Sequence, residues 1–357
     1  MKTWEANIRK VTPYIPGEQP RSANVIKLNA NENPYPPSPK AGEALREMDP
    51  SLLRKYPDPA CTGLREAIAQ TEGLPTDRVF VGVGSDDVLA MCFLTFFNSE
   101  KPILFPDITY SFYDVWAELF RIPYRQIPLD DDFQIRPGDY EIPNGGVVIA
   151  NPNAPTGQLL PLSVIRRILS ANQDSIVIVD EAYIDFGGES AVPLLEEFEN
   201  LVIVQTFSKY RSMAGLRIGV AFASEYLIRC LNDVKFSFNS FTMNLPSLVA
   251  GTAAVLDQAY YRETVSKIIA TRERIGEPLR RLGFSFHKSS TNFLFVTHNS
   301  CPAAELFEAL KQAGIYVRYF KKPRIANYLR ITIGTDEEMD ALLAFLQTYL
   351  SDRGGEA

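Results

Sequence analysis

A single lysine stands near the end of an apolar run, just after two hydroxyl residues, in the stretch VQTFSKYRSMAGLRIGV, residues 204–220. Because a buried ammonium group is costly, Lys209 at the end of an apolar strand suggests that its amine has a chemical task. Lysine amines form Schiff bases with carbonyl compounds, and pyridoxal phosphate supplies such a carbonyl. Polar side chains flank the lysine in this run: Thr206, Ser208 and Arg217. Since an arginine fork pairs with two phosphate oxygens, the stretch predicts a reactive lysine beside a phosphate-binding group.

Two other apolar segments also end in polar residues. The segment 175–179 is followed by Asp180, and the segment 78–84 is followed by Ser85 and Asp86. A carboxylate after four apolar residues needs a cationic or N–H partner, which a pyridine nitrogen would provide. A small-residue turn before a helix offers backbone N–H groups to a phosphate. Each feature alone also fits an ordinary cap or turn, but their convergence at one sheet edge favours a cofactor site.

Short apolar strands and helical patterns alternate over the part of the chain that carries these residues. Strands are expected at 78–84, 101–106, 145–153, 175–183, 200–208 and 217–224. Fully apolar strands that alternate with helices predict an α/β fold with a mostly parallel sheet covered by helices on both faces. The pattern changes near residue 245 to a long helical stretch, three strands and two further helices. We therefore expect a proline-rich extended arm over 1–40, a large α/β domain over 41–245 and a smaller α+β domain over 246–357.

Composition excludes several classes of function. The net charge of the 357 residues is −7 with no long basic block, which argues against nucleic-acid binding. No apolar run reaches the ~18 residues of a membrane span, and the N-terminus lacks an apolar signal core, so we expect a cytoplasmic protein. With two histidines and four separated cysteines, zinc chemistry and a Ser-His-Asp triad are poor candidates, and we expect no metal.

The segments TFSKYRSMAGLRIG, DEAY and NPNAPTG resemble the signature segments of fold-type-I pyridoxal-phosphate aminotransferases. TPY, LNANENPYPP, RKYPDPACTGLREAIA, GVGSDD, FPDITYSFY, SSTNFLFV and YLRITIG resemble the histidinol-phosphate aminotransferase branch. The resemblance runs from about residue 12 to 350. It implies pyridoxal 5′-phosphate as cofactor and a homodimer that shares its active sites. The implied reaction is ping-pong transamination of L-histidinol phosphate with 2-oxoglutarate, giving imidazole acetol phosphate and glutamate in histidine biosynthesis.

The resemblance also implies roles for individual residues. Lys209 would form the Schiff base and move the proton, Asp180 would pair with the pyridine nitrogen, and Tyr183 would hydrogen-bond the ring oxygen O3′. Tyr110 would stack on the ring, and the phosphate would be surrounded by Ser85, Asp86, Thr206, Ser208 and Arg217. Tyr56 would reach the phosphate of the neighbouring subunit.

The substrate contacts implied by the resemblance are less specific. Arg330 matches the arginine that holds the substrate's α-carboxylate in typical members. Candidates for the distal phosphate of the substrate are Tyr14, Asn33 and Arg318. One departure concerns the family's Asn-Pro-Thr-Gly segment, because Ala154 stands here where the asparagine that touches O3′ is expected. Either Asn153 takes that role or Tyr183 holds O3′ alone.

Three other functions are compatible with these motifs. A phosphothreonine decarboxylase shares the fold and a phosphate-bearing substrate, and an aromatic or broad-range aminotransferase shares the cofactor chemistry. A regulatory or partner-binding protein that binds the cofactor without turnover is disfavoured by the intact set of Lys209, Asp180 and Arg217. Because fold does not fix function, the substrate rests on the resemblance.

Overall fold

The computed structural model describes residues 2–20 and 25–354. Its centre is a seven-stranded sheet of order β2-β8-β7-β6-β5-β3-β4. The strands are β2 (Val79–Gly82), β3 (Ile103–Pro106), β4 (Tyr124–Ile127), β5 (Gly146–Ala150), β6 (Val177–Asp180), β7 (Leu201–Thr206) and β8 (Gly219–Ala223). Only β8 runs antiparallel to its neighbours. The expected α/β fold with a mostly parallel sheet is confirmed. Strand β4 is not among the strands that the sequence predicts.

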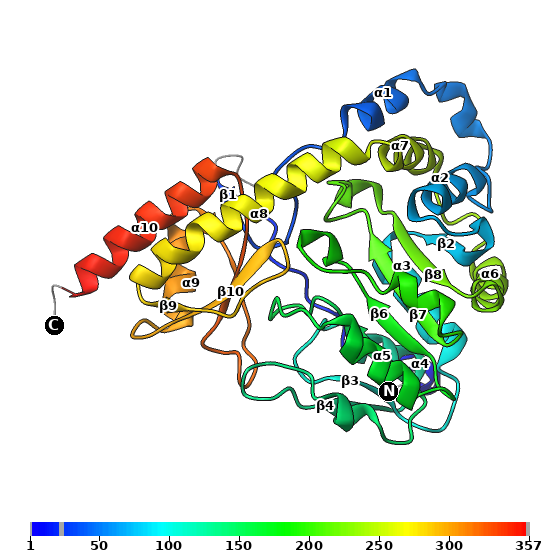
Figure 1. Cartoon of the computed structure of the whole chain (residues 1–357), viewed down its shortest axis with the longest axis horizontal. Coiled ribbons are helices and arrows are strands. Elements are labelled where there is room, and N and C mark those ends of the chain that lie inside the picture. The colour runs from blue at the N-terminus through cyan, green and yellow to red at the C-terminus, as the bar shows by residue number, and fades with distance from the viewer. Residues whose placement is uncertain (1, 21–24, 355–357) are drawn as a thin grey trace.

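Helices cover both faces of this sheet (Figure 1). They are α1 (Pro39–Glu47), α2 (Thr62–Glu72), α3 (Gly84–Phe96), α4 (Tyr113–Phe120), α5 (Leu162–Ala171), α6 (Glu225–Phe238) and α7 (Leu245–Val255). Successive strand residues point to opposite faces, so Val147 and Ile149 pack into one hydrophobic cluster and Val148 into the other. Burial on both faces explains why the strands read as continuous apolar runs.

The C-terminal part is a smaller α+β unit. Its elements are α8 (Gln258–Arg281), β9 (Phe284–Ser285), β10 (Phe293–His298), α9 (Ala303–Gln312), β11 (Ile315–Tyr316), β12 (Arg318–Tyr319), β13 (Leu329–Thr332) and α10 (Asp336–Gly354). Four of these strands form an antiparallel sheet of order β12-β13-β10-β9. Strand β1 (Ile26–Lys27) pairs in parallel with β11, so the end of the N-terminal arm joins this smaller unit.

The two hydrophobic cores meet within α8 rather than near residue 245. Helix α7 packs against α1 and α2, and Tyr261 near the start of α8 still lies in the core of the large domain. From Val265 onward, the buried residues of α8 belong to the core of the smaller unit. Figure 1 shows α8 running from the end of α7 into that unit. The division differs from the expected 41–245 and 246–357 because the change in sequence pattern marks the start of helices, not the edge of a core. Of the expected arm and small domain, residues 1, 21–24 and 355–357 lie outside the described part.

Short 3-10 helices complete the chain: η1 (Thr3–Asn7), η2 (Pro50–Arg54), η3 (Thr76–Arg78), η4 (Pro137–Tyr140), η5 (Ile184–Phe186), η6 (Val192–Glu196) and η7 (Ala214–Leu216). Across the described residues, none of the helices has both the length and the apolar character needed to span a membrane. The same residues bring together no group of three or more His, Cys, Asp or Glu side chains suited to a metal ion.

Candidate active site

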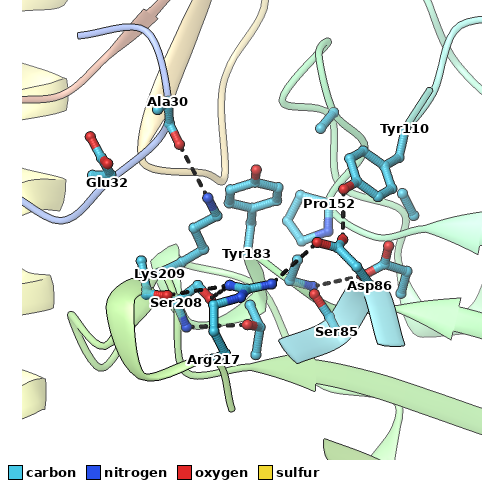
Figure 2. A pocket seen from close by; sticks show the side chains of 16 residues that line it. Ala30, Glu32, Ser85, Asp86, Tyr110, Pro152, Tyr183, Ser208, Lys209 and Arg217 are labelled. Atoms are coloured by element: carbon cyan, nitrogen blue, oxygen red, sulfur yellow. Dashed lines mark hydrogen bonds and ion pairs between the residues drawn. The ribbon is translucent and has the colours of Figure 1, made fainter. Parts of the chain in front are cut away.

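A cavity of about 190 Å³ opens at the carboxyl ends of β5, β6 and β7 (Figure 2). It is lined by Ala30, Glu32, Ser85, Asp86, Tyr110, Ala150, Pro152, Ala154, Asp180, Ala182, Tyr183, Thr206, Ser208, Lys209, Ala214 and Arg217. Ligands of open parallel sheets bind at such an edge. The cavity therefore brings together most of the residues that the sequence predicts for the cofactor.

Lys209 follows β7, and its amine lies inside this cavity. Nζ donates a hydrogen bond to the backbone carbonyl of Ala30 at 3.2 Å and lies 5.9 Å from the centre of the Tyr183 ring. Burial lowers the pKa of Lys209 to about 8, and the Arg330 guanidinium acts in the same direction. About a tenth of this amine is therefore uncharged at pH 7, far more than of an ordinary lysine, and a nucleophilic lysine requires this uncharged form.

Asp180 ends β6 and is almost fully buried. Tyr113 donates its hydroxyl hydrogen bond to Oδ2 at 2.8 Å, and the Ala182 N–H donates to Oδ1 at 3.2 Å. Burial raises the pKa of Asp180 to about 6, whereas these two hydrogen bonds lower it. Tyr113 is not among the site residues that the sequence predicts.

The end of the cavity that the sequence predicts to bind a phosphate is built around Gly84, the first residue of α3. Gly84 has φ +79°, and a Cβ there would lie 2.4 Å from Nη2 of Arg217. The missing side chain lets the guanidinium lie directly over the start of the helix. Ser208 Oγ accepts a hydrogen bond from Arg217 Nη1 at 3.4 Å, and Thr206 Oγ1 accepts one from the Ser208 N–H at 3.1 Å. A guanidinium, hydroxyls and helical N–H groups therefore face one point.

Asp86 was predicted to lie around the cofactor's phosphate, and in the structure it forms hydrogen bonds with other side chains of the site. Its carboxylate accepts hydrogen bonds from Tyr110 Oη at 2.7 Å and from Arg217 Nη2 at 3.3 Å (Figure 2). Burial raises the pKa of Tyr110 well above its usual value, and the charge of Asp86 raises it further. The tyrosine therefore keeps its proton and remains a donor. Because a carboxylate repels a phosphate, Asp86 fits better as the group that orients Tyr110 and Arg217.

The segment 29–33 of the arm, here named the strap, crosses the mouth of the cavity. Its carbonyl groups accept hydrogen bonds from Arg330 Nη2 at Asn29 and from Lys209 Nζ at Ala30. The Asn31 side chain donates to Tyr183 Oη at 2.8 Å. The sequence reading missed these contacts, because two of them use backbone carbonyls and all of them join residues far apart in the chain.

Asn33 is used differently from what the sequence predicts. Its Nδ2 donates to the backbone carbonyl of Lys209 at 3.1 Å, and its Oδ1 accepts from the Tyr35 N–H at 3.0 Å. The Nδ2 end of the amide therefore holds the strap against the segment that carries the lysine, whereas the Oδ1 end stabilises a local turn of the arm. The contact of Asn33 with the substrate's distal phosphate stays a prediction, and the structure adds this contact within the chain.

Asn153, one of the two alternatives predicted for O3′, is not among the residues that line the cavity. Its Nδ2 donates to the Ile108 carbonyl at 2.9 Å and to Thr156 Oγ1, and its Oδ1 accepts from Thr109 Oγ1 at 2.8 Å. The amide is fully used in holding two loops together, whereas the small Ala154 faces the cavity. Tyr183 is then the polar side chain left for O3′.

A second cavity of about 740 Å³ adjoins the first and contains two predicted substrate residues, Tyr14 and Arg318. Tyr14 stacks on Phe112 with 4.3 Å between ring centres, and Arg318 Nη2 donates to the Ile15 carbonyl at 3.3 Å. Arg330 lies close enough to Lys209 to lower its pKa, and its buried Nε has no hydrogen-bond partner within the described residues. A guanidinium with an unsatisfied N–H suits an anionic group of a ligand.

Tyr56 lies outside both cavities. It is 82% exposed and its ring lies 4.6 Å from that of Phe241. Further large apolar side chains are exposed on η2 and near the end of α6: Leu53, Phe236 and Phe238. An apolar surface of this kind marks an interaction site.

Comparison with known proteins agrees with this geometry. Residues 23–346 match the model of the family described as aminotransferase class I and II. The chain is 52% identical over 351 residues to the histidinol-phosphate aminotransferase of Lactococcus lactis subsp. cremoris (strain MG1363), covering 98% of this chain and 99% of the relative. It is 49% identical over 350 residues to that of Acinetobacter baumannii (strain SDF), covering 97% of each.

A solved aminotransferase structure has the same fold at lower sequence identity. The histidinol-phosphate aminotransferase of Sinorhizobium meliloti, in complex with pyridoxal-5′-phosphate, superposes with a TM-score of 0.83 at 25% identity, covering 92% of this chain and 91% of that one. The family match spans most of the chain, and the curated relatives match over nearly all of it. The chain therefore belongs to the class I and II aminotransferase family.

Proposed function

We propose that this chain is a pyridoxal-phosphate-dependent aminotransferase that converts L-histidinol phosphate and 2-oxoglutarate into imidazole acetol phosphate and glutamate, a step of histidine biosynthesis in the cytoplasm. The observation that carries the chemistry is the single cavity that contains the Lys209 amine, the buried Asp180 carboxylate and the Arg217 guanidinium. The relatives of about 50% identity over the full chain support the choice of substrate.

The described residues fit pyridoxal phosphate. Asp180 is buried, and among the described residues only its hydrogen bonds, and no cation, offset that burial, so a protonated ring nitrogen would complete its environment. At the opposite end, Gly84 leaves the space that lets Arg217 meet the first turn of α3. Arg217, Ser208 and the helical N–H groups would hold the phosphate, and Tyr183 would hydrogen-bond O3′.

The protein's own groups would position and move protons around this cofactor. When bound, pyridoxal phosphate supplies an aldehyde that captures amines and a protonated ring that withdraws electrons from the substrate's Cα. Asp180 keeps the proton on the ring nitrogen. Lys209 Nζ, whose lowered pKa of about 8 makes the uncharged form accessible near neutral pH, accepts the proton from Cα. Its hydrogen bond to the Ala30 carbonyl holds the free amine inside the cavity.

Two arginines would recognise the anionic groups of the substrates. Arg330 has a buried Nε without a hydrogen-bond partner among the described residues, and its charge acts on Lys209, so it would bind the α-carboxylate of glutamate. Arg318 lines the large second cavity together with Tyr14, where the distal phosphate of histidinol phosphate would lie. Planar guanidinium groups suit both anions.

The apolar surface around Tyr56 supports a homodimer. Tyr56, Leu53 and Phe238 are each more than half exposed, which a second copy of the chain would cover. In such a dimer Tyr56 would reach the partner's phosphate site, as the family resemblance implies. Replacing Phe238 with lysine is expected to shift sedimentation toward the monomer, and an unchanged sedimentation coefficient would contradict this placement of the interface.

A half-reaction tests the proposed function. Purified protein loaded with pyridoxal phosphate is mixed with histidinol phosphate alone, and conversion to the pyridoxamine form is followed by visible absorption. Parallel samples receive phosphothreonine or phenylalanine, and Lys209→Ala is the control. Rapid conversion selective for histidinol phosphate is expected. Conversion by phenylalanine alone would indicate an aromatic aminotransferase, and carbon dioxide release from phosphothreonine would indicate a decarboxylase. Absence of a visible band would contradict the role of Lys209.

A further inference from the structure

We propose that Asn31 is a positioning residue for the reaction, because it fixes the direction in which Tyr183 donates its hydroxyl proton. The strap amide occupies one side of the Tyr183 oxygen and leaves its proton for an acceptor inside the cavity. The inference rests on the proposed function, in which that acceptor is the cofactor's ring oxygen O3′.

The orientation of the Asn31 amide follows from a count of protons at Thr332. The Asn31 backbone N–H donates to Thr332 Oγ1 at 3.0 Å. The hydroxyl therefore acts as an acceptor there, and its single proton is donated to Asn31 Oδ1 at 3.1 Å. With Oδ1 facing Thr332, the Nδ2 group faces Tyr183 Oη at 2.8 Å. The hydrogen bond from Thr332 thus favours this orientation over the flipped amide, which would present an acceptor to the tyrosine.

This orientation decides the role of the Tyr183 hydroxyl. Because Asn31 Nδ2 can only donate, the tyrosine oxygen must accept, and its own proton is left for a different partner. Tyr183 lines the cavity, and Figure 2 shows its ring standing between Lys209 and Pro152. Burial raises the pKa of Tyr183, with the Asn31 hydrogen bond opposing this rise, so the proton is retained.

Asn31 itself is held firmly from the smaller unit. It is 1% exposed, and its carbonyl accepts a hydrogen bond from Asn292 Nδ2 at 3.0 Å. Its φ is +54°, a left-handed conformation that asparagine tolerates better than most residues. Thr332 lies on β13 and Asn292 directly precedes β10. The amide is thus anchored on the smaller unit and directed at a tyrosine of the large domain.

Asn31→Asp tests the proposal because it keeps the shape of the side chain but removes the N–H donor. Tyr183 would then donate its proton to the new carboxylate, and the ring oxygen would lose a hydrogen bond. The negative charge on the ring oxygen is uncompensated in the high-pH form of the bound cofactor, so a donated hydrogen bond favours that form. Its loss should move the pH midpoint of the cofactor's visible colour change upward by about one unit, the effect of one hydrogen bond to a charged group.

A double-mutant cycle with Tyr183→Phe separates positioning from the new negative charge and from structural damage. The charge acts in both backgrounds, whereas loss of the tyrosine's hydrogen bond is possible only when Tyr183 is present. We expect the upward shift caused by Asn31→Asp to be about one pH unit larger with Tyr183 than with Tyr183→Phe. Asn29→Asp is the matched control, because it places the same charge on the strap where the side chain contacts the Glu18 carbonyl instead.

Equal shifts in the two backgrounds would overturn the proposal and leave Asn31 with a structural role. The melting temperature of the cofactor-free variants gives a second readout. If Asn31 has a purely structural role, its replacement should lower the melting temperature without moving the pH midpoint. If Asn31→Asp does not fold, Thr332→Val is the alternative variant, because it removes the hydroxyl that orients the amide. The shift of the pH midpoint that Thr332→Val causes should also disappear in the Tyr183→Phe background. A failure of the proposed function is distinguishable, because then the unsubstituted protein itself shows no visible band.

Discussion

The free Lys209 amine is expected to react with carbonyl compounds at neutral pH much faster than an ordinary lysine. Its pKa is lowered from 10.5 to about 8, mainly by burial. At about pH 7.5 the uncharged fraction of such an amine is about a quarter, against about a thousandth for an unperturbed lysine. The reactive form is therefore enriched roughly 200-fold, and its concentration should level off above about pH 9.

Arg330→Gln changes this behaviour in a defined direction. The Arg330 charge is the second cause of the lowered pKa of Lys209, so its removal should move the pKa upward. Burial is the larger cause and remains, so the variant should still titrate below 10.5. The variant should lose reactivity near neutral pH and recover it at higher pH.

Stopped-flow capture of pyridoxal by the cofactor-free protein measures both effects. Pyridoxal lacks the phosphate, so ionisation of that group does not enter the pH profile, and Lys209→Ala is the control for other lysines. The unsubstituted protein should show a midpoint near pH 8. A rate that keeps rising tenfold per unit to about pH 10 would refute the reasoning, because it is the behaviour of an unperturbed amine. An identical midpoint in Arg330→Gln would refute the contribution of the arginine.

Three further predictions concern Gly84, Tyr113 and Lys209. Gly84→Ala should weaken cofactor binding at least about tenfold in fluorescence titrations, because its Cβ would lie 2.4 Å from Arg217 Nη2, whereas Gly63→Ala, with no atom within 4 Å, should bind normally. Tyr113→Phe removes the bond to Asp180 and should lower the free energy of unfolding by about 1–2 kcal/mol in denaturant titrations, and an unchanged midpoint would contradict its role. Because the folded-state pKa of Lys209 lies below its unfolded value, the unfolded chain binds more protons between about pH 8 and 10.5; the cofactor-free protein should gain stability over that range, and Lys209→Met should lack this gain.

The sequence predicts the residues whose position depends on a single strand. Lys209 and Asp180 each follow an apolar run, and the parallel order of those strands places their carboxyl ends at one edge. The two-faced burial of the sheet follows from the same runs. These features depend on local sequence and on a general rule of α/β sheets, so no tertiary contact is needed to find them.

The contacts that the sequence does not reveal join distant parts of the chain. The Ala30 carbonyl that holds the Lys209 amine carries no side-chain signal, and the Asn31–Tyr183 bond spans 152 positions. The bond from Tyr113 to Asp180 was not predicted, because it depends on which side chain of α4 faces the end of β6. Asn33 and Asp86 were predicted in the right region but with other partners, since side-chain direction is set by packing.

Helix α8 has a consequence for cooperativity. With 24 residues it is about 36 Å long, and its first turn packs in one core while the remainder packs in the other. Neither core can lose its part of this helix without exposing apolar surface next to the other. Two hydrophobic cores that share one continuous helix should therefore unfold together, so that calorimetry of the cofactor-free chain shows one transition where two independent domains would show two.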